Sequence, residues 1–315
     1  MLFNSKIHID DLGGLMGTLH LTNEISFQNF QHLEVCVVPE QATVWIYLNS
    51  SPRPSITLTL LRELKIFQEL LINYKGKLPY QGELVEINYH VVTSRHPVFS
   101  FGGDLEYFLN CIDNRDAHAL KSYAMGCIDT MYPNLCGFNL GITTISLIHG
   151  NALGGGFEAA LSSHVLVAER KAEMGLPEIL FNLFPGMGAY QLLARRTNPG
   201  TAEKMMLSGR LYKAEELYHM GIIDILAEDG EGESTVNAFI HSNRHRQNGY
   251  QAIRKVAQCV SPVDYQQLVA VCDIWVEAAL KLTEKDRRTM ARLIRGQHKY
   301  AAHLTEAPAV RITAS

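Results

Sequence analysis

The sequence predicts an α/β domain of layered sheets and helices, followed by a helical C-terminal extension. Strand-like and helix-like segments alternate from about residue 30 to residue 228, as is typical of layered α/β folds. An acidic, glycine-rich linker, Glu228 to Ser234, comes next, and every later segment has helical spacing. We therefore divide the 315 residues into an N-terminal arm (1–30), a core (31–228) and a C-terminal helical region (229–315).

The core begins with segments that favour a hairpin, a helix and a strand. Residues 32–39 and 42–48 are rich in β-branched and aromatic residues and are separated by a short turn, which indicates two paired strands. Residues 56–74 carry leucine and phenylalanine at helical spacing. Residues 84–93 have alternating apolar residues, which predicts one further strand.

A glycine pair, Gly102-Gly103, marks the next boundary. Asp104 follows it and is a suitable N-cap for a helix, so the pair predicts a strand-to-helix turn with exposed backbone amides. We expect helix over residues 105–132, in one or two pieces with a break near Asn114. Residues 143–148 (TTISLI) then have the composition of a buried strand.

The remaining segments complete the alternation and begin the extension. A short helix over 202–207 ends at a glycine, a second spans 214–220, and residues 222–226 are expected to form a strand. In the extension, Ser261-Pro262 has the pattern of a helix start, and Thr283 is the expected cap of the last helix.

Composition excludes several classes of protein. Lys and Arg number 28 against 32 Asp and Glu, the net charge is -4 and the pI is about 6.4, so nothing indicates a nucleic-acid partner. The six cysteines include no CxxC pair, and we expect free, buried thiols. The N-terminal residues lack the pattern of a signal peptide, and no apolar run approaches the length of a membrane span. We expect a cytoplasmic protein without a membrane association.

The candidate catalytic residues are concentrated in residues 148–196. Three consecutive glycines, Gly154 to Gly156, lead into a helical pattern, and Glu158 and Glu178 stand in otherwise apolar surroundings. Amides that a glycine turn leaves unpaired at a helix start can hold a developing negative charge. Two carboxyl groups beside such a site could move protons to and from one substrate. This combination predicts the active site of an enzyme that acts on acyl thioesters.

Two motifs resemble the crotonase (enoyl-CoA hydratase/isomerase) superfamily. The first is Phe99 to Leu105 (FSFGGDL), and the second is Ile148 to Glu158 (IHGNALGGGFE), followed by MGLPEI and FPGMG. The resemblance covers about residues 85–226 and implies a crotonase (ClpP/crotonase-like) fold of stacked β-sheets and helices. It also implies that Glu158 and Glu178 are the paired catalytic glutamates, with the backbone amides of Gly103 and Gly155 forming an oxyanion hole. The candidate substrate-binding residues are Gly102, Gly154, Phe157, Leu176, Phe181, Phe184 and Met187.

Within the superfamily, the stretches GGGFEAALSSHVLVAER and EMGLPEILFNLFPGMGAY are most similar to the bacterial diffusible-signal-factor synthases. That resemblance implies dehydration of a 3-hydroxyacyl group on acyl carrier protein to a cis-2-enoyl group, and hydrolysis that releases a free fatty acid signal. It implies no metal and no organic cofactor. The expected partners are an acyl carrier protein or acyl-CoA thioester, a sensor-kinase receiver domain, and further copies of the chain. Superfamily members tend to form trimers and dimers of trimers.

Two alternatives stay open at this stage. The first is an ordinary enoyl-CoA hydratase or isomerase, and the second is a non-catalytic regulator on the same fold that binds a kinase. Taken alone, Glu178 resembles a helix-start charge and Glu158 a solvated helix residue. Their joint occurrence with the glycine motifs favours catalysis, and the sequence does not assign which glutamate is the base.

Overall fold

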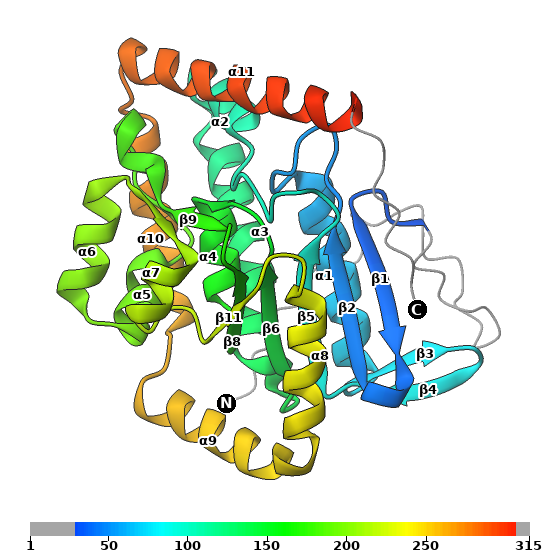
Figure 1. Cartoon of the computed structure of the whole chain (residues 1–315). Helices are drawn as coiled ribbons and strands as arrows, with labels where there is room; N and C mark the ends of the chain where they lie inside the picture. The colour runs from blue at the N-terminus through cyan, green and yellow to red at the C-terminus, as the bar shows by residue number, and fades with distance from the viewer. Residues whose placement is uncertain (1–28, 307–315) are drawn as a thin grey trace.

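The structure, a computed structural model, describes residues 29–306 (Figure 1). Nearly all of the predicted N-terminal arm therefore lies outside the described residues. The predicted hairpin is confirmed: β1 (Leu33–Val38) pairs antiparallel with β2 (Thr43–Leu48), and the short 3-10 helix η3 (Pro39–Gln41) joins them.

The hairpin forms one edge of a six-stranded sheet with the order β1-β2-β5-β6-β8-β11. The strands after the hairpin are β5 (Tyr89–Ser94), β6 (Thr143–Ile148), β8 (Val165–Glu169) and β11 (Ile225–Ala227), and from β2 onward all neighbours are parallel. All six residues of β6 are buried, as expected where both faces of a parallel sheet are covered.

Helices cover the two faces of this sheet (Figure 1). On one face, Val44 and Ile46 of β2 pack in the larger core with α1 (Leu58–Asn73) and α3 (Ala117–Leu135). On the other face, Trp45 and Tyr47 belong to a smaller core with α8 (Gly232–Asn243). Successive side chains of a strand point to opposite faces, so one strand serves both cores.

Two smaller sheets lie outside the six-stranded sheet. A three-stranded sheet has the order β10-β9-β7 and lies beside the active-site segments, and β3 pairs with β4 as a separate hairpin. The bounds are β3 (Lys77–Tyr80), β4 (Glu83–Glu86), α2 (Leu105–Asp113), η4 (Gly137–Asn139), β7 (Ala152–Leu153), α4 (Gly155–Leu161), β9 (Glu173–Gly175), η5 (Pro177–Phe181), α5 (Ala189–Arg196), α6 (Pro199–Ser208), β10 (Leu211–Lys213), α7 (Ala214–His219), η6 (Arg244–Arg246), α9 (Gln247–Val260), α10 (Tyr265–Ala279) and α11 (Glu284–Glu306).

Two strand predictions were wrong in their bounds. The expected strand over 84–93 is two strands, β4 and β5, because the chain leaves the β3–β4 hairpin between them, where Ile87 N donates to Gly76 O at 2.8 Å. The strand expected over 222–226 starts only at Ile225. Before it, the backbone amide of Ile222 donates to Leu217 O in the turn that follows α7.

The extension is helical, as predicted, with one wrong boundary. Ser261 ends α9, and α10 begins at Tyr265, where the side chain of Asp264 accepts from Gln266 N at 2.8 Å. Thr283 precedes α11 as expected, and Asp286 Oδ2 accepts from Thr283 N at 2.9 Å. The predicted linker is also shorter, because α8 already begins at Gly232.

The cysteines are free thiols, but only Cys111, Cys127 and Cys272 are buried, while Cys36 and Cys259 are exposed. Within residues 29–306, no helix has the length and apolar character that crossing a membrane requires.

Helix α9 has its polar side toward the protein and its apolar side toward solvent. Gln251, Arg254 and Gln258 are partly buried, and Gln258 Nε2 donates to Leu135 O at 3.1 Å. Three aliphatic side chains at i, i+3 and i+7 spacing form a stripe on the outer face, with exposed fractions of 67%, 60% and 79%: Ile253, Val256 and Val260. An amphipathic helix of a globular protein normally buries its apolar stripe, whereas the stripe of α9 is exposed.

Candidate active site

A cavity of about 600 Å³ lies where the glycine motifs meet the C-terminal helices. It is lined from α2, α3, α4 and η5 on one side and from α10 and α11 on the other. Its size lies within the range of small-molecule sites. Both predicted catalytic glutamates and both predicted oxyanion glycines line it: Glu158, Glu178, Gly103 and Gly155.

Glu158 is in the first turn of α4 and is 1% exposed. Its Oε1 accepts hydrogen bonds from the backbone amides of Met187 at 2.8 Å and Ala189 at 2.9 Å. Burial raises the pKa of this carboxyl to about 7, although the two amide donors favour the ionised form and act in the opposite direction. The FPGMG segment that contains Met187 thus fixes the position of the first carboxyl.

Glu178 is the second residue of η5, directly after Pro177. Its Oε2 is buried without a hydrogen-bond partner among the described residues. Its Oε1 lies over Gly154, since a Cβ atom on that glycine would come within 2.3 Å of it. Burial, and next the charge of Glu158, raise the pKa of Glu178 to about 8. Both carboxyl groups line the same cavity, so they can act on one substrate.

The direction of the Gly103 amide is set by the peptide group to which it belongs. In a trans peptide the N–H points opposite to the C=O of the preceding residue. Gly102 O accepts from Ile56 N at 2.8 Å, so the Gly103 N–H points away from that loop. Among the hydrogen bonds of residues 29–306, none uses Gly103 N as a donor, which leaves it available to a ligand in the cavity.

Gly155 provides the second amide by the same rule. Gly154 O accepts from the amides of Phe157 and Glu158 at 2.9 and 3.0 Å, so the Gly155 N–H points out of the N-terminus of α4. It likewise has no acceptor within the described chain. A Cβ on Gly155 would lie 3.3 Å from Gly103 N, so the two free donors are close neighbours at the cavity. Such a pair of preorganised donors is suited to stabilise an oxyanion.

The substrate-binding candidates divide into two groups. Gly154, Phe181 and Met187 line the cavity. Gly102, Phe157, Leu176 and Phe184 are not among the residues that line it, and their contact with a substrate stays a prediction. Phe157 and Leu176 are 0% and 1% exposed because they pack in the main core. Gly102 lies behind the hole, where a Cβ would come within 3.0 Å of Gly155 N.

Sequence reasoning missed the cavity wall that comes from distant helices. This wall consists of aromatic and small residues of α2 and α3, Trp275 of α10, and one face of α11: Phe108, Tyr123, Ala124, Cys127, Trp275, Leu293 and Tyr300. Trp275 meets Phe108 edge-on, with ring centroids 5.0 Å apart. Apolar positions at helical spacing indicate only a buried face, and the sequence offered no signal that this face borders a cavity.

The residues suited to metal binding are not grouped. Among the described residues, no cluster of three or more His, Cys, Asp or Glu side chains has the arrangement of a metal site. The arrangement that is present, two protonatable carboxyls and two amide donors around an apolar cavity, can abstract a proton next to a carbonyl and stabilise the enolate.

Comparison with known proteins adds a family and a fold. The family model for enoyl-CoA hydratase/isomerase matches residues 86–303. An enoyl-CoA hydratase from Bacillus halodurans superposes with a TM-score of 0.69 at 18% identity, covering 83% of this chain and 100% of that one. DspI from Pseudomonas aeruginosa gives 0.64 at 22% identity, over 87% and 100%. An enoyl-CoA hydratase/isomerase from Xanthobacter autotrophicus Py2 gives 0.67 at 16%, over 89% and 100%. These structures confirm the crotonase fold.

Proposed function

Because this chain belongs to the enoyl-CoA hydratase/isomerase family, we propose that it is a diffusible-signal-factor synthase. It dehydrates a 3-hydroxyacyl thioester of acyl carrier protein to the cis-2-enoyl thioester, and then hydrolyses the thioester to a free cis-2-unsaturated fatty acid. The observation that carries the proposal is the pairing of two buried carboxyls of raised pKa, Glu158 and Glu178, with two neighbouring free amide donors at the same cavity.

The first reaction needs one base and one acid on the same substrate. One glutamate removes a proton from C2, and the resulting negative charge collects on the thioester oxygen between the amides of Gly103 and Gly155. The other glutamate protonates the departing C3 hydroxyl, which leaves as water. An apolar, buried site suits this step because the donors act more strongly where water is excluded. Each proton taken from C2 is balanced by one given to the hydroxyl.

The second reaction uses the same groups. A carboxylate takes a proton from a water molecule, whose oxygen attacks the thioester carbon. The same two amides stabilise the tetrahedral oxyanion. The carbon–sulfur bond then breaks while the protonated carboxyl returns its proton to the leaving sulfur, which gives the free acid and the carrier thiol. One site thus accounts for both steps, and the resemblance of its two central stretches to signal-factor synthases supports this assignment over simple hydration.

Product analysis tests the proposal. The purified chain is incubated with 3-hydroxyacyl thioesters of acyl carrier protein and of CoA, over a range of chain lengths, and the lipids are identified by mass spectrometry. We expect a free cis-2-unsaturated acid from the carrier-protein substrate. Hydration of crotonyl-CoA without release of any free acid would instead identify the chain as an enoyl-CoA hydratase.

The alternative function is that of a non-catalytic regulator that binds a kinase receiver domain. It predicts that Glu158→Ala and Glu178→Ala leave signal production unchanged while kinase binding is lost. Both carboxyls are present and turned toward one cavity, which supports the enzyme.

The pH dependence of dehydration should be bell-shaped. The two carboxyls have pKa values of about 7 and about 8, and such a pair titrates in two steps that belong to both groups. Below about pH 7 both are protonated and the base is lost, and above about pH 8 both are ionised and the acid is lost. We expect kcat/KM, which reports the free enzyme, to peak between these values. A profile flat from pH 5 to 9 would contradict shared acid–base catalysis.

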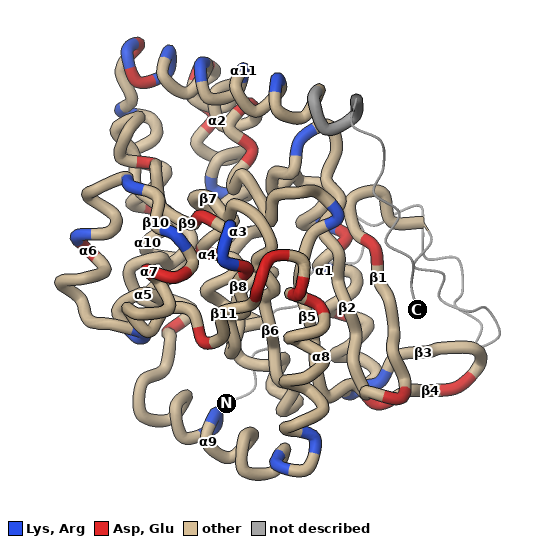
Figure 2. Tube along the Cα trace, viewed as in Figure 1, with Lys and Arg blue, Asp and Glu red and all other residues tan. Residues whose placement is uncertain are grey.

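The exposed stripe of α9 is the proposed contact between copies of the chain. Its i, i+3, i+7 spacing is that of a helix–helix seam. Figure 2 shows that the charged residues along α9 are Lys and Arg, so the contact depends on the apolar stripe and not on ion pairs between two copies of the helix. Val256→Glu places a charge in the stripe and should reduce the mass measured by light scattering. Asn248→Glu, at an exposed position of the same helix outside the stripe, is the control. A wild-type chain that is monomeric at high concentration would contradict this interface.

A further inference from the structure

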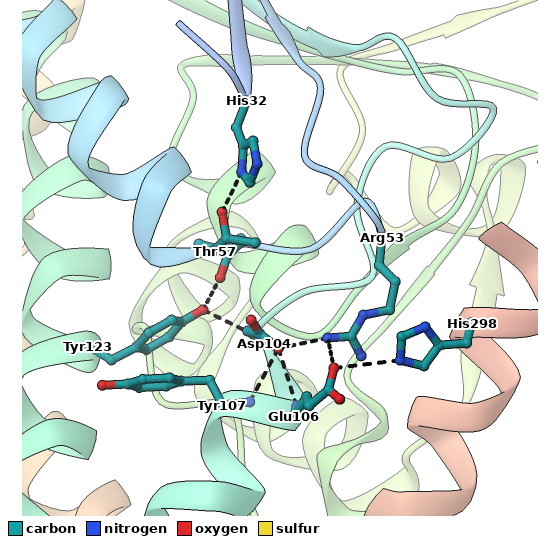
Figure 3. A network of polar contacts seen from close by, with 9 residues as sticks. His32, Arg53, Thr57, Asp104, Glu106, Tyr107, Tyr123 and His298 are labelled. Atoms are coloured by element: carbon teal, nitrogen blue, oxygen red, sulfur yellow. Dashed lines mark hydrogen bonds and ion pairs between the residues drawn. The ribbon is translucent and has the colours of Figure 1, made fainter. Parts of the chain in front are cut away.

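Tyr123 is a buried tyrosine whose hydroxyl joins two backbone segments beside the oxyanion hole. It comes from α3, is 2% exposed and lines the cavity. Its hydroxyl donates to Ile56 O and accepts from Asp104 N at 3.2 Å (Figure 3). The ring stacks on Tyr107 and meets Phe108 edge-on, with centroids 5.6 and 4.8 Å away. The hydroxyl therefore has a fixed position.

Gly103 is held from both sides through this arrangement. The peptide group before it is fixed by the bond from Ile56 N to Gly102 O at 2.8 Å. The peptide group after it is fixed by the bond from Asp104 N to the Tyr123 hydroxyl. Because the same hydroxyl also holds Ile56 O, one oxygen atom couples the loop before α1 to the glycine turn.

Charged side chains reinforce the same turn from its outer side. The Arg53 guanidinium is 5% exposed, and its Nη2 donates to Asp104 Oδ1 at 3.0 Å and to Glu106 Oε2 at 2.8 Å (Figure 3). Asp104 in turn caps α2. These contacts hold the carboxyl of Asp104, whereas its backbone amide donates to the Tyr123 hydroxyl and lies at the parallel bridge that joins Ile56 to Gly103.

We propose that Tyr123 is a positioning residue that orients the Gly103 amide toward the thioester oxygen of the substrate. This inference rests on the proposed function. Tyr123 does not exchange protons with the substrate, because its donor and acceptor are both engaged by backbone groups. Burial also raises the pKa of its hydroxyl well above the usual value, so the residue stays neutral throughout the working range.

Tyr123→Phe removes the oxygen and keeps the ring. Loss of a whole oxyanion donor costs about 10²–10³ in rate, and a donor that is present but misdirected should cost at least about 10-fold. The hole acts mainly in the transition state, so kcat for dehydration of a 3-hydroxyacyl thioester should fall while KM changes less than about twofold. Tyr107→Phe is the matched control: that ring stacks on Tyr123, but its hydroxyl points away from the turn in Figure 3, and we expect unchanged kcat.

A spectroscopic readout separates this inference from the proposed function. A cinnamoyl thioester of pantetheine absorbs at longer wavelength when hydrogen bonds polarise its carbonyl. We expect a red shift on binding to the wild-type chain, a smaller shift with Tyr123→Phe, and the full shift with Tyr107→Phe. If Tyr123→Phe keeps the full shift and full kcat, the positioning role is wrong and the hole stands. If the wild-type chain gives no shift, the hole itself is wrong, and the inference fails with it.

Hydrogen exchange in the wild-type chain tests the inference without any variant. The Asp104 amide, bonded to a buried hydroxyl, should exchange much more slowly than the Gly103 amide, which faces the cavity. Equal rates for the two amides would show that Tyr123 does not hold the turn. The pH profile of Tyr123→Phe should keep both limbs of the wild-type curve, and loss of one limb would show proton transfer by the tyrosine instead of positioning.

Discussion

Glu158→Gln should lower the rate of dehydration by about 10²–10⁴, the range that a positioned acid or base contributes. The amide is close in shape to the carboxyl and its oxygen can still accept from Met187 N and Ala189 N, so the fold should be retained. Glu178→Gln should have a loss of the same order, because each carboxyl has a separate task. Steady-state kinetics on a 3-hydroxyacyl thioester measures both.

A matched control is available elsewhere in the chain. Glu63 is also buried and accepts one backbone hydrogen bond on each carboxyl oxygen, from Gln31 N at 2.7 Å and from His32 N at 2.8 Å, so Glu63→Gln can keep one of the two. It does not line the cavity. Glu63→Gln should therefore keep wild-type activity. If Glu158→Gln is as active as this control, Glu158 has no catalytic role.

Glu158→Gln should also be more stable than the wild-type chain at high pH. Burial raises the pKa of Glu158 from 4.5 to about 7, so the folded state favours the protonated form. The contribution of Glu158 to the free energy of unfolding is then fully present below about pH 4.5 and is lost as the pH rises through about 7. At higher pH the ionised, buried carboxyl lowers the free energy of unfolding by roughly 3 kcal/mol. Glu158→Gln avoids this cost. Thermal unfolding should show its advantage at pH 8 and a much smaller one at pH 5.

Gly155→Ala should reduce turnover by about 10²–10³, the cost of losing an oxyanion donor. The added methyl group would lie 3.0 Å from Met187 Sδ and 3.3 Å from Gly103 N, between the two donors. It would crowd the space beside the Gly103 amide, where the thioester oxygen is proposed to bind, while Gly155 itself has no positive φ that would make alanine strained. We expect loss of kcat with a modest change in melting temperature.

Gly249→Ala is the control for this substitution. Gly249 lies in α9, and a Cβ there would meet nothing within 4 Å. Alanine at this helix position should leave activity unchanged and stabilise the protein by about 0.5–1 kcal/mol. Wild-type turnover by Gly155→Ala would rule out the proposed position of the oxyanion.

Local chemistry made the glycine turns predictable from sequence. A run of glycines before a helix pattern indicates unpaired amides, and Asp104 after Gly102-Gly103 indicates a capped helix start. The structure has both features, with Asp104 accepting from Glu106 N at 3.2 Å. Strand β6 was also predictable, because six consecutive buried-type residues have no other stable place than a covered sheet.

The pairing of the two glutamates was suggested by order and spacing, but their pKa values depend on the tertiary structure. Glu158 is buried, and its Oε1 is held by two amides of the segment that follows η5, Met187 N and Ala189 N. The pKa of Glu178 is raised further by the charge of Glu158, which is 20 residues away in the sequence. Neither environment can be read from the residues beside each glutamate.

The sequence by itself determined the fold class, the order of most helices and strands, and the residue types that can do the chemistry, since these follow from local periodicity and backbone preference. Only the tertiary structure decided which apolar residues surround the cavity. Phe157 and Leu176, close to the glutamates in sequence, turned into the core, whereas Trp275, Leu293 and Tyr300 reached the cavity from the extension. The physical reason is that a wall is formed by packing between distant elements, and periodicity specifies that a face is buried without specifying what it is buried against.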